Sequence, residues 1–185
     1  MQPPLSKEKQ IAAIVPRYTL SGNITVVMNT DGSQATTSLQ TRTLLRRLAY
    51  SQAFDLHAVK KRSSVLTQRA ILQPLPLSAG LVLFPVKTRI PRIPGDTTTG
   101  YVNLHAVSKV CEEEAPPYQS LIHLTGGWKL PVIWSAITVK KHLQEAKLSA
   151  AAPLPASGSH PELHMIAQKL VEIFYEILTF KKGQE

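Results

Sequence analysis

Apolar positions along the chain predict a mainly antiparallel sheet. Residues 11–15 and 23–28 are rich in aliphatic and β-branched side chains, which favour strands. The pairs Asp31-Gly32 and Gly126-Gly127 are typical of tight turns, and each lies between two such runs. Further extended segments are expected at residues 34–39, 75–78, 81–86, 101–107, 121–124 and 129–133.

Helical spacing of apolar residues predicts four helices. Thr41 is expected to cap the first, over about residues 42–53, and Asp55 the second, over about 55–70. Ser135 is expected to cap the third, over about 136–147, and the fourth spans about 161–180. The apolar sides of the first two helices are Leu44, Leu45 and Leu48, and then Leu56, Val59, Leu66 and Ala70. We therefore expect an α+β fold, with two central basic helices and two C-terminal helices.

A composition change near residue 148 indicates two parts. Residues 148–160 are rich in alanine, proline, serine and glycine, as linkers are. We expect an α+β domain over residues 1–147, a linker over 148–160 and an amphipathic helix within 161–185. The apolar face of that helix must pack on the same chain or on a second one, and it comprises Leu163, Ile166, Leu170, Ile173, Phe174 and Ile177. A homo-oligomer is one expectation from this face.

Composition places the chain among globular proteins. Of its 185 residues 43% are hydrophobic, yet no run approaches the roughly 18 apolar residues of a membrane span. The first ten residues lack the apolar core of a signal peptide, and Cys111 is the only cysteine of the sequence. These features predict a cytoplasmic protein without a membrane partner.

The net charge of +9 is concentrated in one stretch. Residues 42–92 hold one acid, Asp55, and ten basic residues, namely Arg42, Arg46, Arg47, Lys60, Lys61, Arg62, Arg69, Lys87, Arg89 and Arg92. A concentrated positive field attracts polyanions. Nucleic acid is the first partner that this pattern indicates, ahead of an acidic membrane surface or an acidic protein.

An apolar strand leads directly into part of this basic stretch. Residues 81–84 are apolar, and Pro85 is expected to end the strand because proline cannot donate to a sheet ladder. Lys87, Arg89 and Arg92 follow, with prolines that keep the backbone extended. We expect a stiff, exposed, basic loop, which is a common basis for a binding site.

The sequence gives little support for a catalytic or metal-binding motif. Phosphate-loop, dinucleotide-binding and nucleophile-elbow patterns are absent from the sequence. His160 and His164 have helical spacing but lack the His-Glu-x-x-His order, and Ser157 and Ser159 lie in the expected linker. We expect no enzyme, no cofactor and no metal.

The order of features resembles the competence transcription factor ComK family. The resemblance covers residues 46–146 and rests on several modest matches in the right order: YSQAFD at 50–55, KKR at 60–62, PLPL at 74–77, LFPVKT at 83–88, LTGG at 124–127, IWS at 133–135 and the helix at 139–146. The family's Gly-Arg is Ala58-Val59 here, and its Trp-Ile is Tyr101-Val102. Residues 148–185 have no clear family counterpart.

The resemblance implies a transcription activator of DNA-uptake genes. Such a protein would bind A·T-rich boxes of double-stranded DNA mainly through the minor groove, as a dimer or higher assembly, under control of an adaptor–protease pair. Inserted arginines favour narrow A·T-rich grooves, which suits Arg89 and Arg92. Phosphate anchoring suits the helix cations. The expected DNA-binding set is Arg46, Arg47, Lys60, Lys61, Arg62, Arg69, Lys87, Arg89 and Arg92.

Other interpretations stay open. The chain could be a non-enzymatic protein-interaction module that has lost DNA binding and recruits a partner through its last helix. It also faintly resembles, over residues 102–135, a LytTR-like DNA-binding domain, whose contacts would be expected in the major groove. An enzyme would need a pocket that gathers several histidines and acids.

Overall fold

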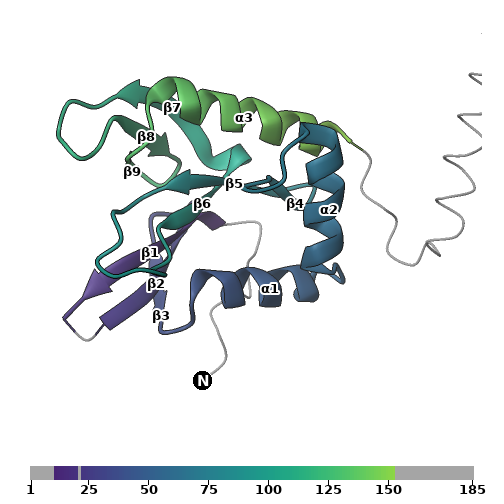
Figure 1. Cartoon of the computed structure of the whole chain (residues 1–185), viewed down its shortest axis with the longest axis horizontal. Coiled ribbons are helices and arrows are strands. Elements are labelled where there is room, and N and C mark those ends of the chain that lie inside the picture. Colours follow the sequence, from purple (N-terminus) through teal and green to yellow (C-terminus); the bar gives the residue numbers. More distant parts are fainter. Residues whose placement is uncertain (1–10, 21, 153–185) are drawn as a thin grey trace, which may run out of the picture. The chain divides into compact units, whose positions relative to one another are not determined.

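The structure of the chain, a computed structural model, describes residues 11–20 and 22–152 (Figure 1). Six strands form the larger sheet: β1 (Ile11–Thr19), β2 (Gly22–Asn29), β3 (Gln34–Thr37), β4 (Leu75–Ser78), β5 (Leu81–Lys87) and β6 (Thr99–Asn103). Their order is β3-β2-β1-β6-β5-β4, and every neighbouring pair is antiparallel.

A smaller sheet and three helices complete the described part. The sheet consists of β7 (Val107–Glu112), β8 (Ser120–Leu124) and β9 (Trp128–Val132), again antiparallel. The helices are α1 (Thr41–Ser51), α2 (Leu56–Thr67) and α3 (Ala136–Ala151). The predicted α+β fold with a mainly antiparallel sheet is therefore confirmed.

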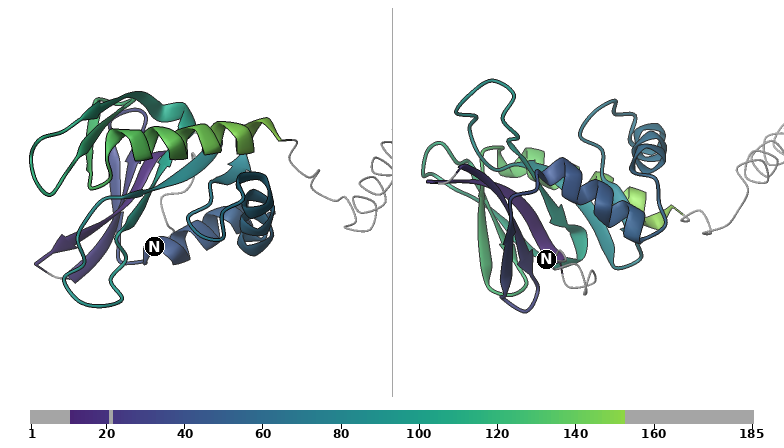
Figure 2. Two further views of the ribbon diagram at one scale, coloured as in Figure 1. Left: turned by 45° about the horizontal axis from the view of Figure 1, so that its top comes forward. Right: turned by 90° about the horizontal axis from the view of Figure 1, so that it is seen from below.

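The large sheet is buried on both faces, as the alternation along β5 makes clear. Leu81 and Leu83 point to the layer that holds α1 and α2. Val82, Phe84 and Val86 belong to the opposite core, with the small sheet and α3. Successive strand residues face opposite sides of a sheet, so an apolar run without polar gaps is what a central strand requires. Figures 1 and 2 show the two helices and α3 on either side of this strand.

Helix α1 is held by its apolar side rather than by its length. Leu44, Leu45 and Leu48 are almost fully buried against the sheet. Burial of one leucine side chain contributes about 1.5–3 kcal/mol, whereas an isolated helix of this length is marginal in water. The basic residues of α1 are left on the outer side.

The helix ends agree only in part with the sequence-based expectation. The side chain of Asp55 caps α2, accepting from the backbone N–H groups of His57 and Ala58, both at 3.2 Å. Thr41 is not a cap: it is the first residue of α1, and the cap position is Gln40, whose side chain makes no capping bond. Helix α2 ends at Thr67, so Ala70 of the expected apolar stripe lies outside it, and Leu66 is 44% exposed instead of buried.

Pro85 does not end its strand. β5 runs on to Lys87, with Pro85 opposite Tyr101 of β6. On its other side β5 is paired only as far as Leu83, so no ladder bond to β4 is required at the proline. A proline is tolerated in a strand where its missing N–H would have had no partner.

Two further boundaries differ from expectation. The strand over residues 101–107 breaks at a 3-10 turn, Leu104–Ala106, and the chain then enters the small sheet, so Cys111 lies in β7. Helix α3 continues to Ala151, four residues into the expected linker, with the hydroxyl of Ser135 capping it as predicted. The predicted C-terminal helix and its apolar face lie outside the described residues.

Candidate nucleic-acid interface

A basic cleft lies between α1 and α2. We call it the α1–α2 cleft, and it is lined by Arg42, Thr43, Arg46, Asp55, Leu56, His57 and Lys60. The two arginines are four residues apart and therefore lie on the same side of α1. A second hollow continues over α2 and shares His57 and Lys60 with the cleft while adding Lys61.

Lys60 is the cation of this cleft whose charge is disfavoured by its surroundings. Burial lowers the pKa of Lys60, and the positive charge of Arg42 lowers it further. The one acid of the cleft, Asp55, has its carboxylate committed to the backbone at the start of α2. Within residues 11–20 and 22–152, neither Arg42, Arg46 nor Lys60 forms a salt bridge. An anion entering the cleft would relieve this repulsion.

Residues 88–98, which we call the β5–β6 loop, contain Arg89. We expected this side chain to be exposed, but it is buried. Arg89 is only 8% exposed. Its Nε donates to the carbonyl of Thr97 at 2.7 Å and its Nη1 to the side-chain oxygen of Asn23 at 3.1 Å. Burial lowers the pKa of Arg89. The expectation of an exposed Arg89 is thus wrong, because this side chain ties the loop to β2.

Arg92 differs from Arg89 by remaining exposed. Its guanidinium carbon lies 4.2 Å from the ring centre of Tyr18, and that of Arg89 lies 3.8 Å from the same ring. The Tyr18 hydroxyl donates to the carboxylate of Asp96, which lowers the pKa of Asp96. The backbone N–H of Arg92 donates to the Tyr18 hydroxyl at 2.9 Å. Tyr18 therefore fixes the part of the loop that carries Arg92.

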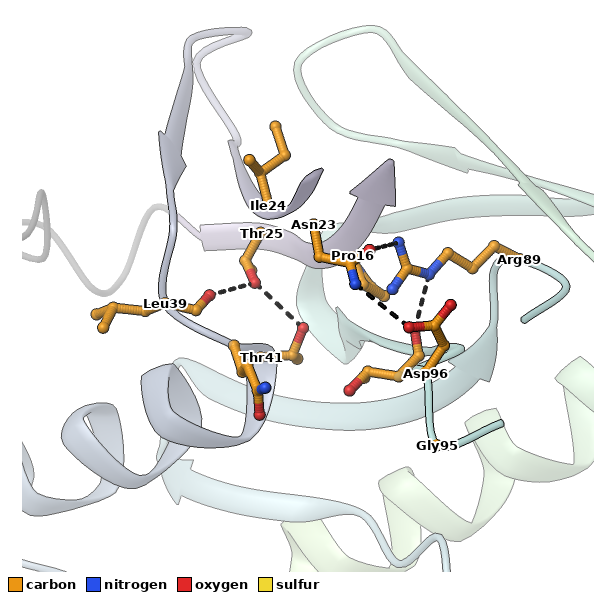
Figure 3. Close-up of a pocket in the computed structure, with 11 residues that line it drawn as sticks. Pro16, Asn23, Ile24, Thr25, Leu39, Thr41, Arg89, Gly95 and Asp96 are labelled. Atoms are coloured by element: carbon orange, nitrogen blue, oxygen red, sulfur yellow. Dashed lines mark hydrogen bonds between the residues drawn. The ribbon is translucent and has the colours of Figure 1, made fainter. Parts of the chain in front are cut away.

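A small pocket joins this loop to the start of α1 (Figure 3). Its volume is about 90 Å³, and its lining includes Arg89 and Asp96 from the loop and Gln40 and Thr41 from α1. We interpret the pocket as the place where the loop lies next to the start of α1.

Arg69 is committed to an ion pair. Its Nε donates to Glu145 Oε1 at 2.8 Å, and its Nη1 lies 3.4 Å from Nε2 of His142. His142 is stacked on Trp134, with ring centres 4.7 Å apart, and burial followed by the charge of Arg69 lowers the pKa of His142. Arg69 therefore links the end of α2 to α3, which leaves it poorly placed for the phosphate contact that we expected.

The remaining predicted cations are divided between surface and partial burial. Arg46, Arg47 and Lys61 are exposed, whereas Arg62 and Lys87 are half-buried. The described residues contain no group of three or more His, Cys, Asp or Glu side chains that could hold a metal ion. His160 and His164 lie outside them. None of the described helices is long and apolar enough to cross a membrane.

Sequence reasoning missed four residues of this region. Arg42 was counted in the basic stretch but left out of the expected DNA-binding set, although its spacing to Arg46 could have placed it on the same side of α1. His57 follows the Asp55 cap and lines the cleft. Tyr18 and Asp96 had no sequence signal, because their pairing joins residues 78 apart in the chain.

Comparison of the chain with protein-family models, with curated proteins and with solved structures finds no match. The resemblance to the ComK family therefore stays a prediction from the sequence.

Proposed function

We propose that this protein binds A·T-rich double-stranded DNA in a sequence-specific manner and activates transcription of DNA-uptake genes. The observation that carries DNA binding is the grouping of Arg42, Arg46 and Lys60 in the α1–α2 cleft, where none of the three forms a salt bridge with another described residue. Basic side chains that neutralise phosphates supply most of the affinity for a duplex. The link to DNA uptake rests on the resemblance to the ComK family alone.

In this proposal the two parts of the interface have different tasks. The cleft cations hold the phosphate backbone, which fixes the register without reading the sequence. The exposed Arg92 enters the minor groove, whose negative potential is strongest where A·T pairs narrow it. In support, both elements adjoin the start of α1: the loop lines a pocket together with Gln40 and Thr41, and the cleft is lined from Arg42 onward. Figure 1 and the left view of Figure 2 show the loop and α1 on the same side of the sheets.

The test is binding to labelled A·T-rich and G·C-rich duplexes over a salt series. We expect the A·T duplex to bind more tightly, with log affinity falling linearly against log salt at a slope of about 0.9 per phosphate contact. Arg42→Ala, Arg46→Ala and Lys60→Ala should each weaken binding to both duplexes and reduce the slope. Lys109→Ala and Lys129→Ala are matched controls, because both lysines are exposed on the small sheet.

Three outcomes separate the alternatives. Steep salt dependence without an A·T preference would leave a general polyanion binder. A preference that survives minor-groove competitors and is lost with major-groove competitors would favour a LytTR-like mode. Absence of binding at low salt would refute the proposal and favour the protein-interaction module, for which the exposed Val65 and Ile71, 74% and 73% accessible, would be starting points.

A further inference from the structure

The β5–β6 loop presents two large apolar side chains to solvent. Ile90 and Ile93 are 55% and 64% exposed, and they flank the exposed Arg92. Pro91 and Pro94 alternate with them and are exposed as well. Single exposed apolar side chains are normal on a protein surface, whereas apolar side chains gathered in one exposed patch mark interaction surfaces.

The exposure of these isoleucines does not come from a loose loop. The base of the loop is closed by a hydrogen bond from the N–H of Thr88 to the carbonyl of Thr98, at 2.9 Å. Near its tip, the N–H groups of Arg92 and Ile93 donate to the carboxylate of Asp96, at 3.1 and 3.3 Å. These backbone N–H groups are therefore hydrogen-bonded within the loop, and the side chains of Ile90 and Ile93 face the solvent.

The surroundings of the loop favour a polyanion over an apolar protein partner. The nearest acid, Asp96, has its carboxylate occupied by Tyr18, by Asn23 and by the two loop N–H groups. The loop pocket connects the loop with the start of α1, where the cations of the α1–α2 cleft begin. A narrow, pinned, proline-containing loop with one arginine between two isoleucines combines the residue types that proteins insert into the minor groove.

We propose that residues 90–93 form a minor-groove wedge, in which Ile90 and Ile93 press against base pairs and unstack one step while Arg92 follows the groove floor. This inference rests on the proposed DNA-binding function and adds a deformation of the duplex to it. Unstacking is least costly at flexible pyrimidine–purine steps such as TA. The wedge would therefore select among A·T-rich sequences by the deformability of the step at which it enters. Tyr18 and Asp96 act as positioning residues for the wedge.

The experiment uses the full-length protein and an A·T-rich duplex that carries 2-aminopurine in place of one adenine at a TA step. The fluorescence of this base rises when it loses its stacking neighbours. The double variant Ile90→Ala/Ile93→Ala removes the wedge, and Ile137→Ala is the matched control, since Ile137 is 78% exposed on α3. Both variants change exposed side chains, and their far-ultraviolet circular dichroism checks that they fold.

We expect fluorescence to rise when the wild type and Ile137→Ala bind, and the rise to be at least halved for the double variant at saturating protein. The salt slope of the double variant should match that of the wild type, because no charge is removed. A full rise with the double variant, or wild-type binding without any rise, would overturn the wedge while leaving DNA binding intact. Absence of wild-type binding to any duplex would overturn both the wedge and the proposed function.

Discussion

The ion pair between Arg69 and Glu145 gives the sharpest test of how α2 is held. We consider Arg69→Met, which removes the guanidinium and keeps most of the apolar side chain. The carboxylate of Glu145 is then left with a side-chain exposure of 12% and without its cation, and His142 loses the donor next to its Nε2. Removing one partner of a fully buried pair costs about 3–5 kcal/mol.

The magnitude here is set by partial exposure. The Arg69 side chain is 27% exposed, so water compensates part of the loss. We therefore expect the free energy of unfolding to fall by about 2–3 kcal/mol, short of the fully buried limit. At about 2–4 °C per kcal/mol for a protein of this size, the midpoint of thermal unfolding should drop by roughly 4–12 °C.

Urea denaturation of a double-mutant cycle is the assay. Arg69→Met/Glu145→Met leaves no unpaired charge and should be within about 1 kcal/mol of the wild type, because an apolar pair of similar volume can replace a buried ion pair. Lys141→Met, at an exposed position of α3, should change stability by no more than about 0.5 kcal/mol. A single variant as stable as the wild type, or additive losses in the double variant, would refute the reasoning.

The same variant separates a structural role of Arg69 from a role in DNA binding. If Arg69 only links α2 to α3, Arg69→Met should leave the salt slope of DNA binding unchanged. A phosphate contact by Arg69 would instead reduce the slope by about 0.9. That reduction would restore the assignment of Arg69 to the DNA-binding set.

Three other outcomes are expected. The pKa of His142 is held below its ordinary value, so the unfolded chain binds the proton more readily. The free energy of unfolding should therefore fall as the pH drops below about 6.5. In urea unfolding measured from about pH 8 to about pH 5, His142→Phe should remove this pH dependence, and a profile identical to that of the wild type would contradict the reasoning. Arg89→Ala breaks two hydrogen bonds of a buried cation and should lower the free energy of unfolding by about 2–3 kcal/mol. Arg92→Ala should lower it by no more than about 0.5 kcal/mol and should weaken the A·T preference. Equal losses in urea denaturation would contradict the different roles of the two arginines. Gly126→Ala should lower the thermal midpoint more than Gly127→Ala, because both positions have positive φ but only the first places a Cβ 2.8 Å from backbone atoms of the β2–β3 turn.

Local chemistry made several elements of this fold predictable. The carboxylate of Asp55 and the hydroxyl of Ser135 cap α2 and α3 as the sequence indicates, because a cap needs only the following two or three residues. The turns at Asp31-Gly32 and Gly126-Gly127 also follow from local preferences, and all three glycines have positive φ. The concentration of positive charge between residues 42 and 92 is visible before any folding.

The elements that were predicted wrongly depend on neighbours distant in the chain. Whether Pro85 ends a strand is decided by how far β4 extends beside it, and whether Leu66 is buried is decided by which elements pack against α2. Secondary-structure propensity alone predicts neither the continuation of the strand through Pro85 nor the exposure of Leu66. In both cases tertiary pairing outweighs the preference of the residue itself.

The same division applies to the cations. The sequence by itself determined that the chain is basic, that its net charge is concentrated within residues 42–92, and that the first two helices keep their charges off the apolar side. Only the tertiary structure decided which charges stay available. It buried Arg89 against Asn23, 66 residues away, and paired Arg69 with Glu145, 76 residues away. It brought Lys60 and Arg42 together with neither of them in a salt bridge to another described residue. A charge is satisfied or left open by the atoms within a few ångströms of it, and those atoms are chosen by the fold.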